Sequence, residues 1–213
     1  ITGCMIGALA QILPERVPAA SAGELLVIAF GGSHPNGNRY VVGELIAGGS
    51  GASAGLDGVD VIETDATNCM NLPAEAMEME APIRVHRVAL RKDSGGAGTF
   101  RGGLGVVREY EILDGEVSLS HRGERHFFSA PGLDGGSEGA RAHSVIRRAG
   151  GTEEIIPSKV VTTLRKGDRL IVETAGGGGY GDPRARSPEL VREDVRNGKI
   201  SEEAARAAYG PDA

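Results

Sequence analysis

Long apolar runs, basic clusters and multiple cysteines are missing from this sequence, and each absence excludes a class of protein. No run approaches the roughly 18–20 apolar residues that a membrane span needs, which predicts a soluble protein. The formal net charge is −6, so a nucleic-acid or anionic-membrane partner is disfavoured. The two cysteines, Cys4 and Cys69, provide neither a disulfide framework nor a metal-type spacing, which favours a reducing, cytoplasmic setting.

Two common nucleotide-binding motifs are also missing. The stretch TAGGGGYGDP (174–183) lacks the Lys-Ser/Thr ending of a Walker A loop. No G-x-G-x-x-G opens a helix with an acidic residue about twenty positions further on. We therefore expect no ATP binding by either route in this chain.

Glycine, in contrast, is in excess. The 34 glycines among 213 residues are about twice the average usage of roughly 7%. Because they lie between strand-like segments, we expect glycine-rich turns in a β structure rather than disorder. The four consecutive glycines at 176–179 are interpreted as a shaped turn that closes over a substrate cavity or packs on a partner.

Alternating apolar residues predict the strands. Segments 24–30 and 39–47 flank Asn36-Gly37, a strong hairpin signal. Segments 105–113 and 116–122 predict a second hairpin across Asp114-Gly115. Further strands are expected at 83–90 and in the sequences SVIRR, EIIPSKVVTTL and RLIVETA.

Helices are predicted mainly at the two ends. Apolar residues at helical spacing precede Pro14, and Ser187 and Ser201 are expected to cap two C-terminal helices. A short helix is also expected within 71–82, between two prolines. The fold class is therefore α+β, with a β-rich core of antiparallel hairpins in a single domain over residues 1–213. Since the first helix begins at residue 1 without an initiator Met, we interpret residue 1 as an internal position of a longer polypeptide.

Two isolated patterns do not support catalysis or metal binding. GASAG (51–55) matches the nucleophile-elbow pattern around Ser53, but that pattern needs a strand before it and a helix after it, and LDGVDV follows Gly55. His121 and His126 are five positions apart, so in a continuous strand they point to opposite faces and cannot share a metal. Both are interpreted as solvated or turn histidines.

Two polar clusters remain as candidate sites. In TNCMNLPAEAMEMEAP, Asn68 and Asn71 precede a helix that carries Glu75 and Glu78 on one face. They can orient a substrate carbonyl and supply a base, or they can cap a helix with a solvated acidic face.

The second cluster is RKDSGGAGTFRGGLGVVRE. Its glycine turns hold Asp93 and Arg101, which can form an anion site or a structural tie across the loop.

These motifs, in order with GALAQILPERVPAASAG and AGGGGYGDP, resemble the hydantoinase B/oxoprolinase family from Gly7 to about Tyr209. The resemblance implies a subunit of an ATP-dependent amidohydrolase or a related carboxylase. In such enzymes an A-type partner uses ATP and Mg to phosphorylate a substrate such as a lactam or a cyclic imide. The B-type part then completes the conversion, so the absence of an ATP motif here is expected.

The resemblance also implies that this chain is the C-terminal part of a longer B-type polypeptide. Its missing N-terminal half is then a further partner and the place to look for any metal, and no metal ligand or bound cofactor is assigned to this chain. Some relatives have histidines where this chain has Glu63 and Asp65, which leaves the shared substrate open.

The resemblance implies a shared site built from both motifs. Glu75, Asn68 and Arg101 are the predicted catalytic residues, with Asn68 and Arg101 positioning the substrate or its phosphorylated form. The predicted substrate-binding residues are Asn71, Asp93, Ser94, Gly177 and Gly178. Two alternatives stay open: a component of an acetone- or acetophenone-type carboxylase, and a non-catalytic scaffold.

Overall fold

The computed structural model describes residues 1–23, 26–64 and 67–211. In these ranges, nine strands and four α-helices confirm the predicted α+β class. Residues 24 and 25 of the first predicted strand lie outside the described residues. The elements are α1 (Thr2–Ala10), β1 (Leu26–Ser33), β2 (Arg39–Ile46), α2 (Ala74–Glu80), β3 (Ile83–Leu90), β4 (Val106–Ile112), β5 (Glu116–Arg122), β6 (His143–Arg147), β7 (Glu153–Ile155), β8 (Lys159–Arg165), β9 (Arg169–Glu173), α3 (Pro188–Arg196) and α4 (Glu202–Tyr209), with 3₁₀ turns η1 (Pro14–Arg16) and η2 (Pro183–Ala185).

The strands form two antiparallel sheets. One has the order β2-β1-β5-β8 and the other the order β3-β4-β9-β6-β7. The predicted first hairpin is confirmed, since β1 and β2 pair along their whole lengths. At its turn, Gly37 has a φ of +85° and the Asn38 amide donates to Asn36 Oδ1 at 3.0 Å, as an Asn-Gly turn requires.

The predicted second hairpin is wrong. β4 pairs with β3 and β9, whereas β5 pairs with β1 and β8, so the Asp114-Gly115 turn joins the two sheets. Ile112 and Val117, on either side of the turn, are both fully buried in the same core. Strand alternation reports that a strand has a buried face, but it does not report which strand lies beside it. EIIPSKVVTTL likewise contributes to both sheets, as β7 and β8, with Pro157 between them.

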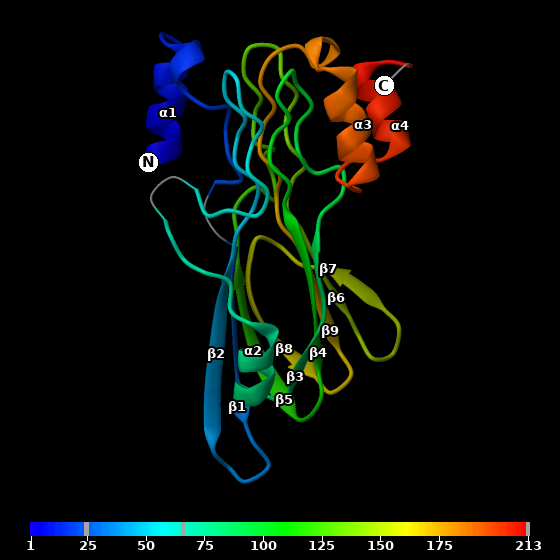
Figure 1. The fold of residues 1–213 in the computed structure, drawn as a ribbon. Coiled ribbons are helices and arrows are strands. Elements are labelled where there is room, and N and C mark those ends of the chain that lie inside the picture. The colour runs from blue at the N-terminus through cyan, green and yellow to red at the C-terminus, as the bar shows by residue number, and fades with distance from the viewer. Residues whose placement is uncertain (24–25, 65–66, 212–213) are drawn as a thin grey trace.

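Aliphatic and aromatic side chains from both sheets fill the space between them and form one core. Phe30 of β1 and Tyr110 of β4 meet there with ring centroids 5.5 Å apart. Met77 of α2 is buried in the same core, so α2 closes one side of the sandwich (Figure 1).

One charged cluster is buried inside this sandwich. Glu44 of β2 forms an ion pair with Arg108 of β4, and the Tyr110 hydroxyl donates to Glu44 Oε2 at 2.6 Å. Burial raises the pKa of Glu44 even though Tyr110 and Arg108 oppose the shift. Buried charges of this kind are tolerated because each has a partner.

Beyond the sandwich, extended segments without regular strands pack into what we call the glycine bundle: residues 48–60, 93–105, 130–140 and 174–181 (Figure 1). They are hydrogen-bonded to one another by their backbones. For example, the Gly177 amide donates to the Gly103 carbonyl at 2.9 Å, and the Gly103 amide donates to the Ser50 carbonyl at 2.8 Å.

The glycine run 176–179 lies inside this bundle. A Cβ added to Gly176 would lie 1.8 Å from the Ser94 carbonyl oxygen, and one added to Gly179 would lie 2.2 Å from that of Ala97. These two glycines, three positions apart, therefore face the same neighbouring segment.

Gly177 and Gly178 face two other segments of the bundle. A Cβ on Gly177 would lie 1.9 Å from the Ser50 carbonyl oxygen, and a Cβ on Gly178 would lie 2.2 Å from that of Pro131. The facing pattern repeats every three residues, the period of a polyproline II helix. The run is thus an extended segment with backbone neighbours on three sides, and the interpretation as a shaped turn is wrong.

The remaining helices flank the bundle, with α1 on one side and α3 and α4 on the other (Figure 1). Ser201 caps α4 as predicted, because its Oγ accepts from the Ala204 amide at 3.1 Å. Ser187 precedes Pro188 at the start of α3, but its hydroxyl donates to Glu189 instead of capping the helix. No described residue of α1 is buried. Among the described residues, no helix is long and apolar enough to cross a membrane.

Candidate functional site

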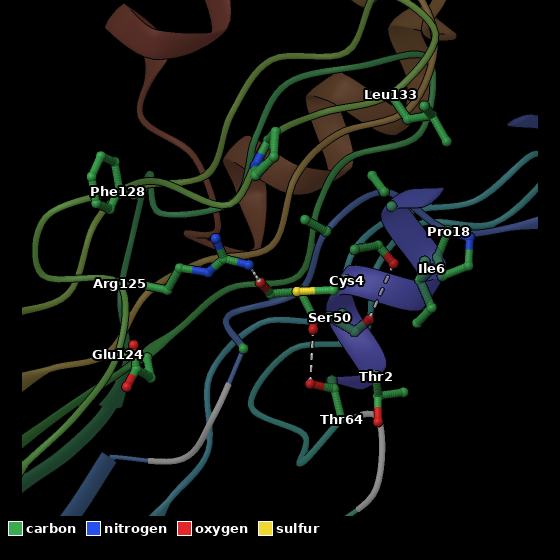
Figure 2. Close-up of a pocket in the computed structure, with 18 of the residues that line it drawn as sticks. Thr2, Cys4, Ile6, Pro18, Ser50, Thr64, Glu124, Arg125, Phe128 and Leu133 are labelled. Atoms are coloured by element: carbon green, nitrogen blue, oxygen red, sulfur yellow. Dashed lines mark hydrogen bonds between the residues drawn. The ribbon is translucent and has the colours of Figure 1, made fainter. Parts of the chain in front are cut away.

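A cavity of about 1200 Å³ lies between α1 and the glycine bundle. Among the described residues, its walls come from α1 and from residues within 18–23, 50–51, 59–64 and 123–133, together with Thr67. Ile6, Pro18, Phe128 and Leu133 are among the apolar residues that line it (Figure 2). A concave, largely apolar space with a few convergent polar groups is the usual form of a small-molecule site.

Arg125 anchors one wall of this cavity. Its guanidinium donates to the carbonyls of Ser129 and Ser21, each at 3.1 Å, and the second contact is drawn in Figure 2. Its φ of +59° is uncommon for a non-glycine residue. A backbone conformation of this kind persists where surrounding contacts hold it, and such residues are frequent at functional sites.

Uncharged hydroxyls and two carboxylates also belong to the polar lining, as do Gln11 and His126. The Thr64 hydroxyl donates to Ser21 Oγ at 3.0 Å, and the Ser50 Oγ accepts from the Val59 amide at 2.7 Å. The carboxylates belong to Glu63 and Glu124.

The first family-like motif begins at the wall of this cavity. Thr67 lines it, and Asn68 and Asn71 follow on the exposed chain that leads to α2. Asp65 lies outside the described residues. Glu75 is exposed on α2 and is not part of the lining, so the structure places Asn68 next to the cavity and Glu75 away from it. Their catalytic roles stay predictions.

Arg101, predicted to contact substrate, instead lies in a charged cluster between the bundle and α3. The residue is 1% exposed, and its guanidinium donates to Asp194 at 3.3 Å and to Asp60 at 3.2 Å. The alternative tie between Asp93 and Arg101 is wrong, because Asp93 accepts from the Ser201 amide at 2.6 Å. Sequence proximity favoured Asp93, but the real partners come from distant segments.

Two further cations complete the cluster. Arg186 binds Asp57 in a bidentate manner, with both distances 2.7 Å, and also donates to Asp194 at 2.7 Å. Lys199 pairs with Asp60 at 2.8 Å.

The pKa values of two carboxyl groups follow from these contacts. Burial by itself would raise the pKa of Asp57 and Asp60, but hydrogen bonds from Arg186 and Lys199 and the nearby positive charges outweigh it and lower both. Both carboxylates are thus stabilised in their charged forms.

The other predicted binding residues also have contacts within the protein. Ser94 is 1% exposed; its hydroxyl donates to the Arg91 carbonyl at 2.5 Å and accepts from the Gly105 amide at 2.9 Å. Gly177 and Gly178 are buried inside the bundle and do not line the cavity. Ser94, Gly177 and Gly178 therefore each have a role in packing, while a role in substrate binding stays a prediction.

His121 and His126 differ from the expectation. β5 ends at Arg122, so the chain turns and the two rings meet at right angles with centroids 5.5 Å apart. His121 is 1% exposed and its Nε2 lies 2.9 Å from Ser144 Oγ, so the interpretation as a solvated histidine is wrong. Burial, with a contribution from His126, lowers the pKa of His121 to about 4.

The sequence pattern does not indicate Arg125, Glu124 and Phe128 as lining residues. The histidines beside them suggest only a metal pair, and no local pattern predicts a positive φ at Arg125. Among the described residues, no group of three or more His, Cys, Asp and Glu is arranged to hold a metal ion.

The whole chain resembles known proteins in both sequence and structure. The model of the family described as hydantoinase B/oxoprolinase matches residues 1–183. The B subunit of a putative D-/L-hydantoinase from Pseudomonas sp. is 36% identical over 99% of this chain and 35% of its own length. The beta subunit of the caprolactamase of Pseudomonas jessenii is 35% identical over 95% of this chain and 36% of its own length.

Two solved structures are similar to this chain in fold. The ATP-dependent caprolactamase from Pseudomonas jessenii matches with a TM-score of 0.80 and 32% identity over 95% of this chain and 37% of that chain. A nucleotide-free acetone carboxylase matches with a TM-score of 0.76 at 21% identity, over 94% of this chain and 31% of that one, which shows a shared fold.

The chain thus spans about a third of the length of these relatives. Their names describe subunits of amide-hydrolysing enzymes, and the family model covers most of the present sequence. On these grounds the chain belongs to the hydantoinase B/oxoprolinase family.

Proposed function

We propose that this chain is part of the B-type subunit of an ATP-dependent hydrolase of cyclic amides. The observation that carries the proposal is the cavity beside α1, because the family-like motif containing Thr67 and Asn68 begins at its wall. Relatives at 35–36% identity are named as subunits of a hydantoinase and a caprolactamase, which supports the substrate class.

The chemistry of an amide explains why ATP is needed. Resonance makes the amide carbonyl a poor electrophile, and phosphorylation of its oxygen creates a leaving group. In our proposal an A-type partner, using ATP and Mg, performs this phosphorylation. The B-type polypeptide, of which this chain is the C-terminal part, then completes the hydrolysis, and any metal is held by its N-terminal part.

We assign roles according to position. Asn68, which follows the lining residue Thr67, and Asn71, further along the same exposed chain, orient the substrate carbonyl through their amide groups. Glu75 is the acid–base candidate if another part of the polypeptide brings substrate to α2. Arg101 positions the substrate indirectly, by holding the bundle in place through Asp60 and Asp194.

The test uses the full-length B-type chain with its A-type partner. ADP release and the ring-opened product are measured with ε-caprolactam, hydantoin and 5-oxoproline. We expect ATP-dependent ring opening of at least one of them and a loss of about 10- to 100-fold in kcat/KM for Asn68→Ala, since removal of one positioning contact costs roughly 1.4–2.7 kcal/mol. Asn36→Ala, in the β1–β2 turn, is the matched control and should leave kcat/KM unchanged.

Two results would contradict the proposal. ATP use that depends on bicarbonate would indicate a carboxylase instead. Normal turnover by Asn68→Ala, together with a loss of assembly for Arg101→Met, would indicate that this part of the chain is a scaffold.

A further inference from the structure

We propose that the cavity beside α1 selects an uncharged cyclic amide with an apolar ring and discriminates against the same ring carrying a carboxylate. This inference rests on the proposed function, because it names the substrate class of the same site.

The apolar part of the lining favours a ring without charge. Ile6, Pro18 and Leu133 lie on the side of α1, while Phe128 lies on the other side beside Arg125 and Glu124 (Figure 2). Phe128 is 80% exposed in the chain as it stands. A methylene ring placed against these residues would remove apolar surface from water, which is the main source of affinity in such cavities.

The polar part of the lining suits the amide group. Hydroxyls of Ser21, Ser50 and Thr64 lie along the wall nearest the bundle. Hydroxyl groups both donate and accept hydrogen bonds, so they can serve an amide N–H and a carbonyl oxygen alike. None of them adds charge to the cavity.

The charged lining opposes a carboxylate. Glu63 and Glu124 are both lining residues, against the single guanidinium of Arg125. That guanidinium already donates to the carbonyls of Ser21 and Ser129. Lys159 lies at 3.6 Å from Glu124, at the exposed rim. A ligand carboxylate would therefore meet two carboxylates, of which Glu124 alone has Lys159 beside it, and would compete with existing contacts for the guanidinium of Arg125.

A matched pair of ligands tests this inference directly. 5-Oxoproline and its primary carboxamide share one ring and differ in the charge of one substituent. Binding of each to the full-length B-type chain is measured by calorimetry without ATP, with ε-caprolactam as a third ligand. We expect the carboxamide to bind at least about tenfold more tightly than 5-oxoproline, and equal or tighter binding of 5-oxoproline would overturn the inference.

A charge-neutralising variant locates the effect. Glu124→Gln should reduce the preference for the carboxamide by about three- to tenfold, because one of the two like charges is removed. Glu116→Gln, at the far end of β5 where it pairs with Arg165, is the control and should leave the preference unchanged. An unchanged preference in Glu124→Gln would mean that the cavity does not set it.

The two proposals can fail separately. If the B-type chain prefers the uncharged ligand but the complex with its A-type partner opens no ring in the presence of ATP, the proposed function is wrong and the inference stands. If the complex hydrolyses 5-oxoproline with a higher kcat/KM than the carboxamide, the inference is wrong and the proposed function stands.

Discussion

The sandwich and the glycine bundle are two regions of one chain, and the first is packed by side chains whereas the second is packed by backbones. In the sandwich, large side chains such as Phe30, Tyr110 and Leu119 fill the space between sheets. In the bundle, the glycines lack side chains, so the backbones of neighbouring segments approach closely and themselves fill the space. Hydrophobic burial dominates the first region, whereas the second depends on close backbone approach, hydrogen bonds between segments and a charged cluster.

Because of this difference, we expect the sandwich to tolerate a one-carbon change in a side chain better than the bundle does. A side-chain core relaxes in part when a methyl group is removed. A bundle of touching backbones has no soft atoms to move when a methyl group is added, so a one-carbon change should cost much more there.

The largest loss in the free energy of unfolding is expected for Gly177→Ala. The added Cβ would lie 1.9 Å from the Ser50 carbonyl oxygen, so the bundle must separate, at a cost of at least about 3 kcal/mol. Chemical denaturation and soluble yield measure the effect. Gly150→Ala is the matched control, since its Cβ meets nothing within 4 Å and should change stability by no more than about 0.5 kcal/mol. An unchanged unfolding midpoint for Gly177→Ala would refute the packing described for the bundle.

The next effect concerns the charged cluster that holds α3 on the bundle. Arg186→Met leaves the half-buried Asp57 and the buried Asp194 without their shared partner, and loss of one member of a buried ion pair costs about 3–5 kcal/mol. We expect protease cleavage between η2 and α3 to accelerate together with the loss in unfolding free energy. Arg192→Met, which removes an exposed pair with Glu189, should cost less than about 1 kcal/mol; similar losses in both variants would contradict a special role for the cluster.

A pH effect of intermediate size is expected in the sandwich. The pKa of His121 is lowered to about 4 by burial, so the folded state binds fewer protons than the unfolded state, whose histidine pKa is roughly 6.5. The contribution of His121 to the free energy of unfolding should therefore be fully present above pH 6.5. It should be lost as the pH drops from 6.5 to 4, which lowers the free energy of unfolding by at most about 3 kcal/mol. In His121→Gln this part of the acid dependence should disappear, whereas His34→Gln in the β1–β2 turn should keep it. Parallel acid profiles of the wild type and His121→Gln would show that His121 is not held neutral.

The smallest loss of stability is expected for a methyl deletion in the core of the sandwich. Ile28→Val removes one methyl group from the fully buried core of the sandwich and should cost about 0.5–1.5 kcal/mol. It is measured beside Gly177→Ala under the same denaturation conditions. If the two one-carbon changes cost the same, the expected difference in tolerance between the two regions is wrong.

Local secondary structure could be predicted from the sequence. Alternation located the strands, Asn36-Gly37 located the first hairpin, and Ser201 located the start of α4. The order of four motifs was enough to identify the family. These features depend on residues close together in the chain.

The candidate site was readable only in part. The motif around Asn68 pointed to the neighbourhood of the cavity, but the wall built by Glu124, Arg125 and Phe128 was not anticipated. That wall comes from a segment about sixty positions away, and its place at the same cavity as α1 depends on how the bundle is assembled.

The kinds of element, their order and the excess of glycine follow from the amino-acid sequence alone. Three features depend instead on the packing of the folded chain: the Asp114-Gly115 turn crosses between sheets, the run 176–179 lies inside a bundle, and Arg101 pairs with Asp60 and Asp194. The physical reason is the range of the interactions. A side-chain pattern records which face of a segment is buried, whereas the neighbour that buries it is chosen by the packing of the whole chain.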